Sequence, residues 1–220
     1  MMNVKNLGAV HSLFNQYIAE IRSVDEQKDS MRFRRNMERI GEIFAYEISK
    51  SLTFTKKNIT TPLGELSLDL LQHQPVLATI LRAGLPLHQG MLNYFDKAEN
   101  AFVSAYRKHH RDGSFEIKMD YISSPEIRNK TLIITDPMLA TGKSMLIVYK
   151  ELVSAGAPSH THIVSAIASV QGIDYLQKHL PGKKVTLWVG AIDEELTAQS
   201  YIVPGLGDAG DLSFGNKTQE

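Results

Sequence analysis

The spacing of apolar and polar positions changes twice along the chain. In residues 1–50, apolar side chains recur every three or four positions, in one run over 13–21 and another over 33–48. This is the pattern of amphipathic helices. Residues 51–70 are rich in Thr and contain the turn sequence Thr61-Pro62-Leu63-Gly64, which predicts a β-hairpin. We therefore expect an N-terminal helical arm over 1–50, followed by a hairpin over 51–70.

From residue 71 onward, short apolar runs alternate with helical patterns. The apolar runs span 75–81, 101–106, 131–135, 161–170 and 184–190, and helices are expected up to Tyr94, over 143–155 and near 172–180. Strand–helix–strand units in series predict an α/β fold with a mostly parallel sheet flanked by helices. Gly156 is expected to end the 143–155 helix in the left-handed conformation. Ligands of such sheets bind beyond the carboxyl ends of the strands, so we expect the chemistry in the loops after 81, 106 and 135.

Composition limits the classes of function. The chain has 220 residues, which suits a single domain over 1–220 with an α/β core over 71–190. Its 24 basic and 24 acidic side chains balance, and it has no cysteine. Without cysteine there is no disulfide framework and no thiolate zinc site, and balanced charge argues against nucleic-acid binding through the overall field. No apolar run reaches the roughly 18 residues of a membrane span, and the start lacks a signal-peptide core. We expect a cytoplasmic protein that acts on small molecules, with neither nucleic acid nor membrane as a partner.

Two glycine-containing motifs do not fit their usual interpretations. Residues 140–144 end like a nucleotide-triphosphate loop, but Pro137 occupies the place of the first glycine that such a loop needs. Residues 205–210 spell G-x-G-x-x-G, yet only ten residues follow Gly210. A dinucleotide site needs a preceding strand, a following helix and an acidic residue about twenty positions on. Neither motif therefore predicts its usual ligand.

The segment after the 131–135 strand keeps a plausible chemistry of its own. Asp136 ends the strand, and residues 138–144 lead into a helix with Thr141 and Ser144 near its start. Unpaired amides and the positive end of the helix dipole favour a phosphate monoester there, and a nearby carboxylate suits ribose hydroxyls. The alternative is a capped helix start with an Asp that serves only the fold.

Several segments resemble type I phosphoribosyltransferases, in the form found in the uracil phosphoribosyltransferase family. Residues 136–142 (DPMLATG) resemble the loop of that family that binds phosphoribosyl diphosphate (PRPP), and residues 80–85 (ILRAGL) its diphosphate loop. Residues 201–211 (YIVPGLGDAGD) resemble its uracil loop, Phe214-Gly215 the ending that follows, and Arg32-Phe33-Arg34 and Tyr46-Glu47 positions in its N-terminal arm. The likeness covers nearly the whole chain in order, and 201–211 is its most specific part.

The resemblance implies a reaction. Uracil and PRPP would give UMP and diphosphate in pyrimidine salvage, with Mg²⁺ carried by PRPP and a homodimer or larger homo-oligomer as the assembly. The alternative is a regulator of the same fold that senses UMP or PRPP with weak or no catalysis. Residues 191–220 would form the base-binding hood.

The resemblance also implies site residues, position by position. The expected substrate-binding residues are Arg82, Ala83, Gly84, Arg107, Asp136, Pro137, Met138, Leu139, Ala140, Thr141, Gly142, Lys143, Ser144, Ile202, Gly207, Asp208 and Ala209. Asp136 would hold the ribose hydroxyls, and the amides and hydroxyls through Ser144 the 5′-phosphate. The catalytic residues would be Arg82 and Arg107, which neutralise the diphosphate, and Asp208, near the reacting carbon. Ile202, Gly207 and Ala209 would read uracil through their backbone, and a non-proline cis peptide is expected at Arg82–Ala83.

Three positions depart from the family pattern. Lys143 stands where a second glycine is usual, and it either adds a cation at the phosphate or disturbs the turn. Thr135 stands where many type I enzymes have an acid. Residues 108–111 (KHHR) replace polar and acidic residues in a 108–125 segment that is either a surface hairpin or a lid over the site.

Other charged and histidine-rich features have simpler interpretations. Arg32, Arg35 and Arg39 share one side of the 33–48 helix with interleaved Glu side chains, which favours an ion-paired surface over a polyanion site. His160 and His162 would share one face of a strand, with no third metal ligand evident nearby. We expect surface or packing roles for them and predict no protein metal site.

Overall fold

Seven strands form the main path of a mostly parallel sheet. In the computed structural model, residues 1–109 and 115–217 are described, with only the backbone for 105–109 and 115–118. The strand order is β1-β10-β9-β7-β4-β5-β6. The strands are β1 (Asn3–Asn6), β4 (Val76–Leu81), β5 (Glu99–His109), β6 (Phe115–Ser123), β7 (Thr131–Thr135), β9 (His160–Ser169) and β10 (Val185–Asp193). Only β6 is antiparallel to its neighbour, and a short β8 (Met138–Leu139) pairs parallel with β9. The predicted α/β class is confirmed.

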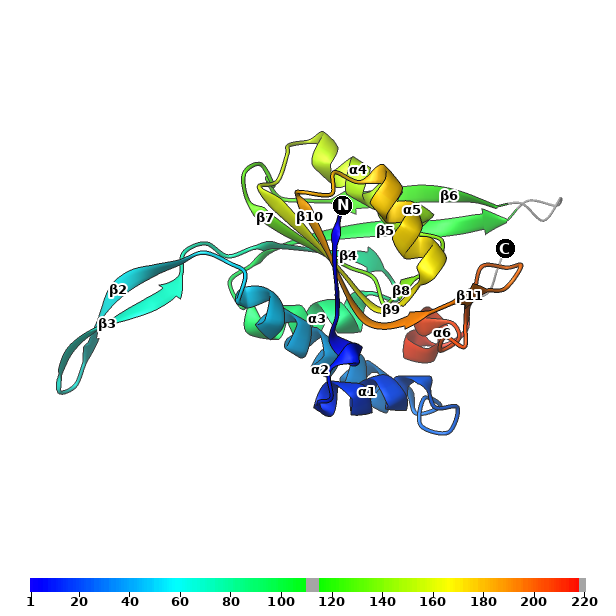
Figure 1. Ribbon diagram of the computed structural model, residues 1–220, viewed down its shortest axis with the longest axis horizontal. Helices are drawn as coiled ribbons and strands as arrows, with labels where there is room; N and C mark the ends of the chain where they lie inside the picture. The colour runs from blue at the N-terminus through cyan, green and yellow to red at the C-terminus, as the bar shows by residue number, and fades with distance from the viewer. Residues whose placement is uncertain (110–114, 218–220) are drawn as a thin grey trace.

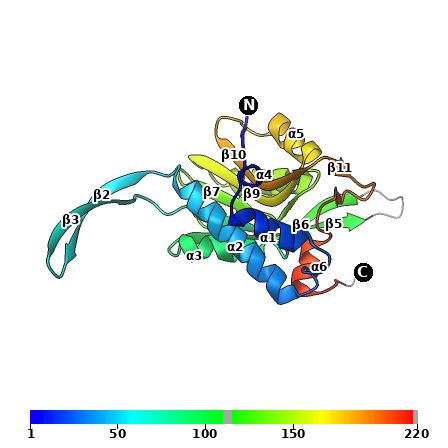
Figure 2. The same ribbon diagram turned by 60° about the horizontal axis from the view of Figure 1, so that its bottom comes forward.

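Helices cover both faces of the sheet (Figures 1 and 2). One face carries α1 (Leu13–Arg22), α2 (Ser30–Ser49) and α3 (Leu85–Tyr94), and the other carries α4 (Lys143–Ser154) and α5 (Val170–His179). Because successive side chains of a strand point to opposite faces, β7 divides its residues between two cores. Leu132 and Ile134 join the core beneath α4 and α5, whereas Ile133 joins the core beneath the N-terminal helices. A turn of 3-10 helix, Leu7–Ala9, connects β1 to α1.

The N-terminal arm packs closely against α3. A Cβ built on Gly90 of α3 would lie 2.0 Å from the carbonyl oxygen of Glu38, and one on Gly41 of α2 would lie 2.3 Å from the carbonyl oxygen of Leu87. Glycine at these two positions therefore lets the backbones of α2 and α3 touch. The arginines on α2 make the local ion pairs expected of them: Arg35 pairs with Glu38 at 2.7 Å, and Arg32 with Glu20 at 3.2 Å.

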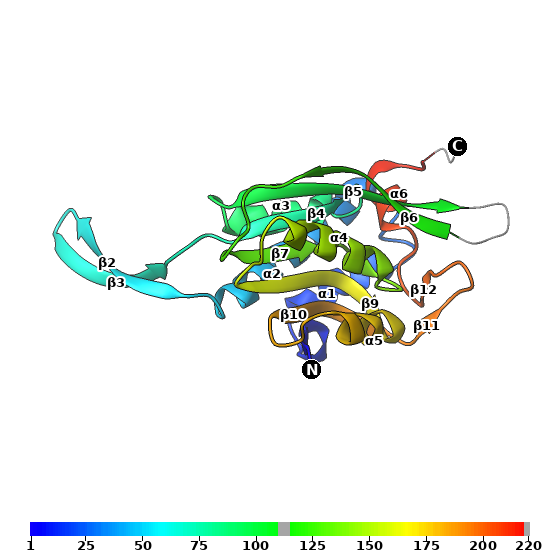
Figure 3. The same ribbon diagram turned by 90° about the horizontal axis from the view of Figure 1, so that it is seen from above.

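The predicted hairpin projects from the body of the molecule (Figures 1 and 3). Its strands are β2 (Phe54–Thr61) and β3 (Gly64–Leu71), paired antiparallel along their length. At the opposite end of the molecule, β11 (Glu195–Leu196) pairs with β12 (Ile202–Val203), and α6 (Ala209–Phe214) follows. No helix among the described residues is long and apolar enough to cross a membrane.

Two local expectations are wrong. Gly156 is not left-handed, because α4 ends with Ala155 in a right-handed conformation and the Gly156 amide bonds the Val153 carbonyl. Glycine there instead avoids crowding, since a Cβ would lie 3.0 Å from the Arg128 Cβ. The segment after Asp136 is not all loop either, because Met138–Leu139 forms β8. Both differences depend on neighbours distant in sequence.

Candidate active site

The loop after β4 turns sharply into α3. The peptide bond Leu81–Arg82 is cis, one residue before the expected Arg82–Ala83 position. The amide of Gly84 donates to the carbonyl of Ile80 at 3.0 Å. A Cβ on Gly84 would lie 2.2 Å from the Thr79 hydroxyl oxygen, so only glycine lets this loop rest directly on the strand end.

The Arg82 side chain extends to the C-terminal segment. Its Nη2 donates to Oδ1 of Asp211 at 2.6 Å and to the carbonyl of Gly215 at 2.9 Å. A Cβ on Gly210 would lie 3.6 Å from Nε of Arg82 and 3.8 Å from Cβ of Ala83. The segment expected to bind diphosphate and the one expected to bind a base therefore lie against each other, although about 120 residues separate them in the sequence.

Asp136 directly follows β7, which pairs with β4, the strand that precedes Arg82. Its amide donates to the carbonyl of Val164 at 3.1 Å, and its own carbonyl accepts from the Ser165 hydroxyl at 2.6 Å. The preceding Thr135 is fully buried and donates to the carbonyl of Ala78 at 3.1 Å. An acid at position 135 would put an unpaired charge inside the sheet, which explains why threonine suits this position.

Ala140 anchors the loop before α4 to the β9–α5 junction. The hydroxyl of Ser169, at the end of β9, donates to the Ala140 carbonyl at 2.6 Å. The same hydroxyl accepts from the amide of Gly172 at 2.9 Å, and a Cβ on Gly172 would lie 2.3 Å from the Ala140 oxygen. Sequence reasoning missed these two residues. The only signal was a serine followed three positions later by a glycine at the start of a helix.

The structure resolves the question that Lys143 raised. Gly142 takes the left-handed conformation, with φ of 75°, and Lys143 is the first residue of α4, exposed and without a positive φ. Lysine at 143 therefore does not disturb the turn. Gly142 offers α4 no side-chain cap, and the Lys143 amide lies 3.4 Å from the Thr141 hydroxyl oxygen. Of the expected loop residues, Leu139 is buried in the core, so only its backbone faces the loop.

The 202–209 segment also presents its main chain. Ile202, Leu206 and Ala209 are buried in the core beneath the N-terminal helices. Between them, Gly205 and Gly207 have φ of 57° and 94°, which side-chain-bearing residues rarely adopt. The peptide Val203–Pro204 is cis. Gly205 is buried, whereas Gly207 is exposed, so the backbone at Gly207 is open to a ligand. The expected reading of uracil by Ile202, Gly207 and Ala209 stays a prediction.

Asp208 caps the helix that follows it. Its Oδ1 accepts from the amides of Gly210 at 2.9 Å and Asp211 at 3.0 Å, and its Oδ2 lies 3.1 Å from Nζ of Lys217. Burial raises the pKa of Asp208, but these amides and Lys217 outweigh it and hold the pKa below its ordinary value. The side chain is therefore a carboxylate at neutral pH. Its capping role and the Lys217 contact were not visible in the sequence.

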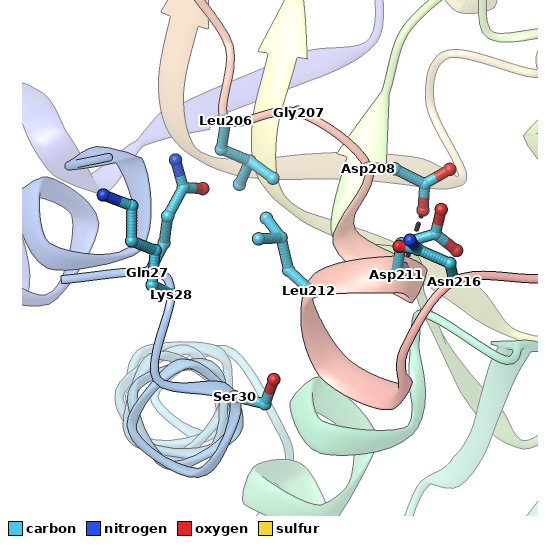
Figure 4. Close-up of a pocket in the computed structure, with 9 residues that line it drawn as sticks. All are labelled: Gln27, Lys28, Ser30, Leu206, Gly207, Asp208, Asp211, Leu212 and Asn216. Atoms are coloured by element: carbon cyan, nitrogen blue, oxygen red, sulfur yellow. Dashed lines mark hydrogen bonds between the residues drawn. The ribbon is translucent and has the colours of Figure 1, made fainter. Parts of the chain in front are cut away.

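A hollow of about 390 Å³ lies beside this segment (Figure 4). Leu206 and Leu212 face it from the C-terminal side, Gln27 and Lys28 from the turn between α1 and α2, and Asp208 from its far end. None of its lining residues comes from the 82–84 or 136–144 loops. The hollow is therefore a groove on the flank of the base segment, shared with the N-terminal arm.

Comparison with known proteins assigns the chain to a family. The model of the uracil phosphoribosyltransferase family matches residues 9–216. A uracil phosphoribosyltransferase of Porphyromonas gingivalis is 56% identical over 98% of this chain and 100% of its own length. One of Pyrococcus furiosus is 37% identical over 98% of this chain and 94% of its own. The chain belongs to the uracil phosphoribosyltransferase family. Among solved structures, the AQ2163 protein of Aquifex aeolicus has a TM-score of 0.85 at 28% identity, with 96% of this chain and 98% of that one covered.

Two features of this member of the uracil phosphoribosyltransferase family lie partly outside the described residues. Arg107 lies on β5 opposite Ile117 of β6, but its side chain is outside them. The 108–125 segment is a hairpin in its described parts, since β5 and β6 pair up to His109 and Phe115. His110 and Arg111 lie outside the described residues, and His109 is the last described residue of β5. The action of the 108–125 segment as a lid stays a prediction.

In this family member, His162 is buried against the sheet and His160, beside it, is partly buried. Nε1 of Trp188 donates to Nδ1 of His162 at 3.1 Å, and the His160 ring lies 4.7 Å from the His162 ring. Burial, with smaller contributions from His160 and Lys5, lowers the pKa of His162 to about 3. Within the described part of the chain, no three His, Cys, Asp or Glu side chains are grouped to hold a metal ion.

Proposed function

We propose that this chain transfers the phosphoribosyl group of PRPP to uracil, giving UMP and diphosphate in pyrimidine salvage. The observation that carries the proposal is the contact between the 82–84 loop and the 201–211 segment. Arg82 bonds Asp211 at 2.6 Å in a chain of the uracil phosphoribosyltransferase family. The arginine proposed to bind diphosphate and the backbone proposed to bind the base lie side by side, which supports a displacement between these two groups.

PRPP would bind at the carboxyl ends of β4 and β7. Asp136 would hold the ribose hydroxyls, and the amides from Thr141 to Ser144 would hold the 5′-phosphate at the N-terminus of α4. The Lys143 side chain is exposed at this end of the helix and adds positive charge there. Pro137, Met138 and Ala140 contribute through the shape and main chain of the loop.

Uracil would be read by the backbone between Ile202 and Ala209. Uracil presents two carbonyl acceptors and one N–H donor on its edge, and these match main-chain N–H and C=O groups. Cytosine carries an amino group at the fourth ring position, which would meet a backbone donor. Because such a mismatch leaves buried groups unpaired, discrimination against cytosine is expected to be strong.

The reaction is a displacement at C1 of the ribose. The bond from C1 to uracil N1 forms, the bond from C1 to the diphosphate oxygen breaks, and positive charge develops on the sugar ring. Arg82 and Arg107 would stabilise the departing anion. Arg82 already has an anionic partner in Asp211, so the more highly charged diphosphate competes for the same guanidinium. Asp208, ionised by its lowered pKa, suits electrostatic support of the cationic sugar better than proton transfer.

Mg²⁺ would enter with PRPP. Magnesium usually keeps several waters and binds through substrate phosphates plus one or two carboxylates, and Asp136 is the acidic residue of the proposed PRPP loop. The ion would supply charge neutralisation to the leaving diphosphate. The protein residues carry the remaining tasks of binding and alignment.

The assembly is proposed to be a homodimer or a larger homo-oligomer in the cytoplasm. What supports association is the hairpin, where Leu66, Leu68 and Leu70 alternate along β3 and are 40%, 46% and 36% exposed. Replacing all three by Ser, followed by light scattering, is expected to give a smaller species. An unchanged mass would exclude the hairpin from the interface.

The proposed reaction has a direct test. Purified protein with PRPP, Mg²⁺ and labelled uracil is expected to give labelled UMP and an equal amount of diphosphate. Labelled cytosine under the same conditions is expected to give no product. If no UMP forms while UMP still binds tightly, the proposed enzymatic activity is contradicted and the alternative, a sensor of the same fold, is supported.

A further inference from the structure

A buried carboxylate lies directly behind the base segment. Asp193 is the last residue of β10, and its side chain is 7% exposed. Its Oδ2 accepts from the amide of Gly205 at 2.9 Å and from Nη2 of Arg22 at 2.9 Å, and Oδ1 lies 3.0 Å from the same Nη2. A buried charge is tolerated only when it is paired and hydrogen-bonded. These contacts satisfy that condition.

The amide that Asp193 binds belongs to the tightest part of the segment. Gly205 has φ of 57°, and a Cβ there would lie 2.1 Å from the carbonyl oxygen of Ile202. Because the peptide unit is planar, fixing this N–H fixes the plane of the Pro204–Gly205 peptide in the turn. Ile202 and Gly207, whose backbones are proposed to face uracil, are only three and two residues away.

Arg22 controls the orientation of the carboxylate. It is the last residue of α1, and its side chain is 21% exposed. Because a single nitrogen of Arg22 contacts both oxygens of Asp193, the carboxylate is held with Oδ2 toward Gly205. The N-terminal arm is thereby connected to the base segment through one buried ion pair.

The same edge of the sheet anchors both substrate loops. Asp193 lies opposite Ser169 in the parallel pairing of β10 and β9. Ser169 holds the carbonyl of Ala140 in the PRPP loop, while Asp193 holds the amide of Gly205 in the base segment. Two adjacent strand ends therefore set the positions of the two loops, one through a hydroxyl and one through a carboxylate.

We propose that Asp193, oriented by Arg22, is a positioning residue that sets the backbone of the base segment for uracil. The proposal rests on the proposed function, because the ligand of that backbone is uracil only if the reaction is as stated. Asp193 acts through Gly205 and does not itself touch substrate. Replacing Asp193 is therefore expected to affect uracil recognition, whereas PRPP binding depends on Ser169.

The test compares Asn and Ala at position 193 in an Arg22→Met background. There the two variants differ mainly in the acceptor offered to the Gly205 amide, and no arginine is left facing an amide group. Losing a hydrogen bond to a buried acceptor is expected to raise KM for uracil about tenfold in Arg22→Met/Asp193→Ala. Arg22→Met/Asp193→Asn is expected to recover most of that loss, with KM for PRPP within about twofold in both. Equal KM values for uracil in the two variants would overturn the proposal.

A control and a second readout separate the possible failures. Lys50→Ala breaks the ion pair of α2 with Glu47, which involves neither Asp193 nor Gly205, and it is expected to leave KM for uracil unchanged. Hydrogen exchange of the 202–208 segment needs no activity, and it is expected to be faster in Asp193→Ala than in wild type. Unchanged exchange would overturn the positioning role, whereas a wild-type protein that forms no UMP would overturn the proposed function alone.

Discussion

Replacing Asp208 by Asn separates its structural task from its electrostatic one. Asn and Asp are equally good N-cap residues, whereas Ala at an N-cap costs about 0.5–2 kcal/mol of stability. Asn therefore keeps the acceptor for the amides of Gly210 and Asp211, which lie 2.9 and 3.0 Å from Oδ1. The lost pair with the half-exposed Lys217 is worth less than about 1 kcal/mol. We expect the free energy of unfolding of Asp208→Asn to lie within about 1 kcal/mol of the wild-type value.

Turnover is expected to change much more than stability. Removing a preorganised charge from a site where charge develops costs about 10²–10³ in kcat, or about 2.7–4 kcal/mol. Initial rates with labelled uracil at saturating PRPP measure kcat, and urea unfolding measures stability. Asp208→Ala serves as the comparison, since it loses the cap and the charge together.

Two results would refute this reasoning. A kcat of Asp208→Asn within about threefold of wild type would show that the charge of Asp208 does not contribute to catalysis. Equal losses of stability in the Asn and Ala variants would show that the side-chain cap does not stabilise the fold. The pH dependence adds a check: because the folded pKa of Asp208 is lowered, its stabilisation is complete above the unfolded Asp pKa and is lost as pH falls through the folded one. Asp208→Asn is expected to lack this part of the acid transition.

Three further predictions concern other parts of the site and the core. Arg82→Met is expected to lower kcat/KM for PRPP about 10²–10³-fold by removing a cation from the leaving group; steady-state rates that stay near wild type would exclude that role. Gly142→Ala is expected to lose about 1–2 kcal/mol in urea unfolding, because φ of 75° disfavours a side chain, and an unchanged midpoint would contradict it. Burial lowers the pKa of His162 to about 3, so below about pH 6.5 the unfolded chain binds a proton that the fold excludes. As pH falls, this group is expected to lower the free energy of unfolding by up to about 1.4 kcal/mol per pH unit. His162→Asn is expected to show a smaller pH slope than wild type in urea unfolding at pH 7, 6 and 5. An equal slope in the two proteins would refute the prediction.

The order of helices and strands could be read from the sequence because it depends on local periodicity. The 131–135 run was expected as a strand and is β7, and the 143–155 pattern is α4 over Lys143–Ser154. The family assignment was also accessible, since the 201–211 segment is contiguous in sequence. The cis peptide was expected one residue too late, because resemblance transfers a loop more reliably than a single bond within it.

Contacts between distant segments were decided only by the tertiary structure. Arg82 meets Asp211 across 129 positions, and Arg22 meets Asp193 across 171. Side-chain periodicity reports which face of an element is buried, but not which residue of another element lies opposite it. Thus the sequence by itself determined the elements, the family and the loops that we propose carry the chemistry. The fold decided which carboxylates serve as anchors, because partner, burial and orientation depend on how the strand ends are brought together.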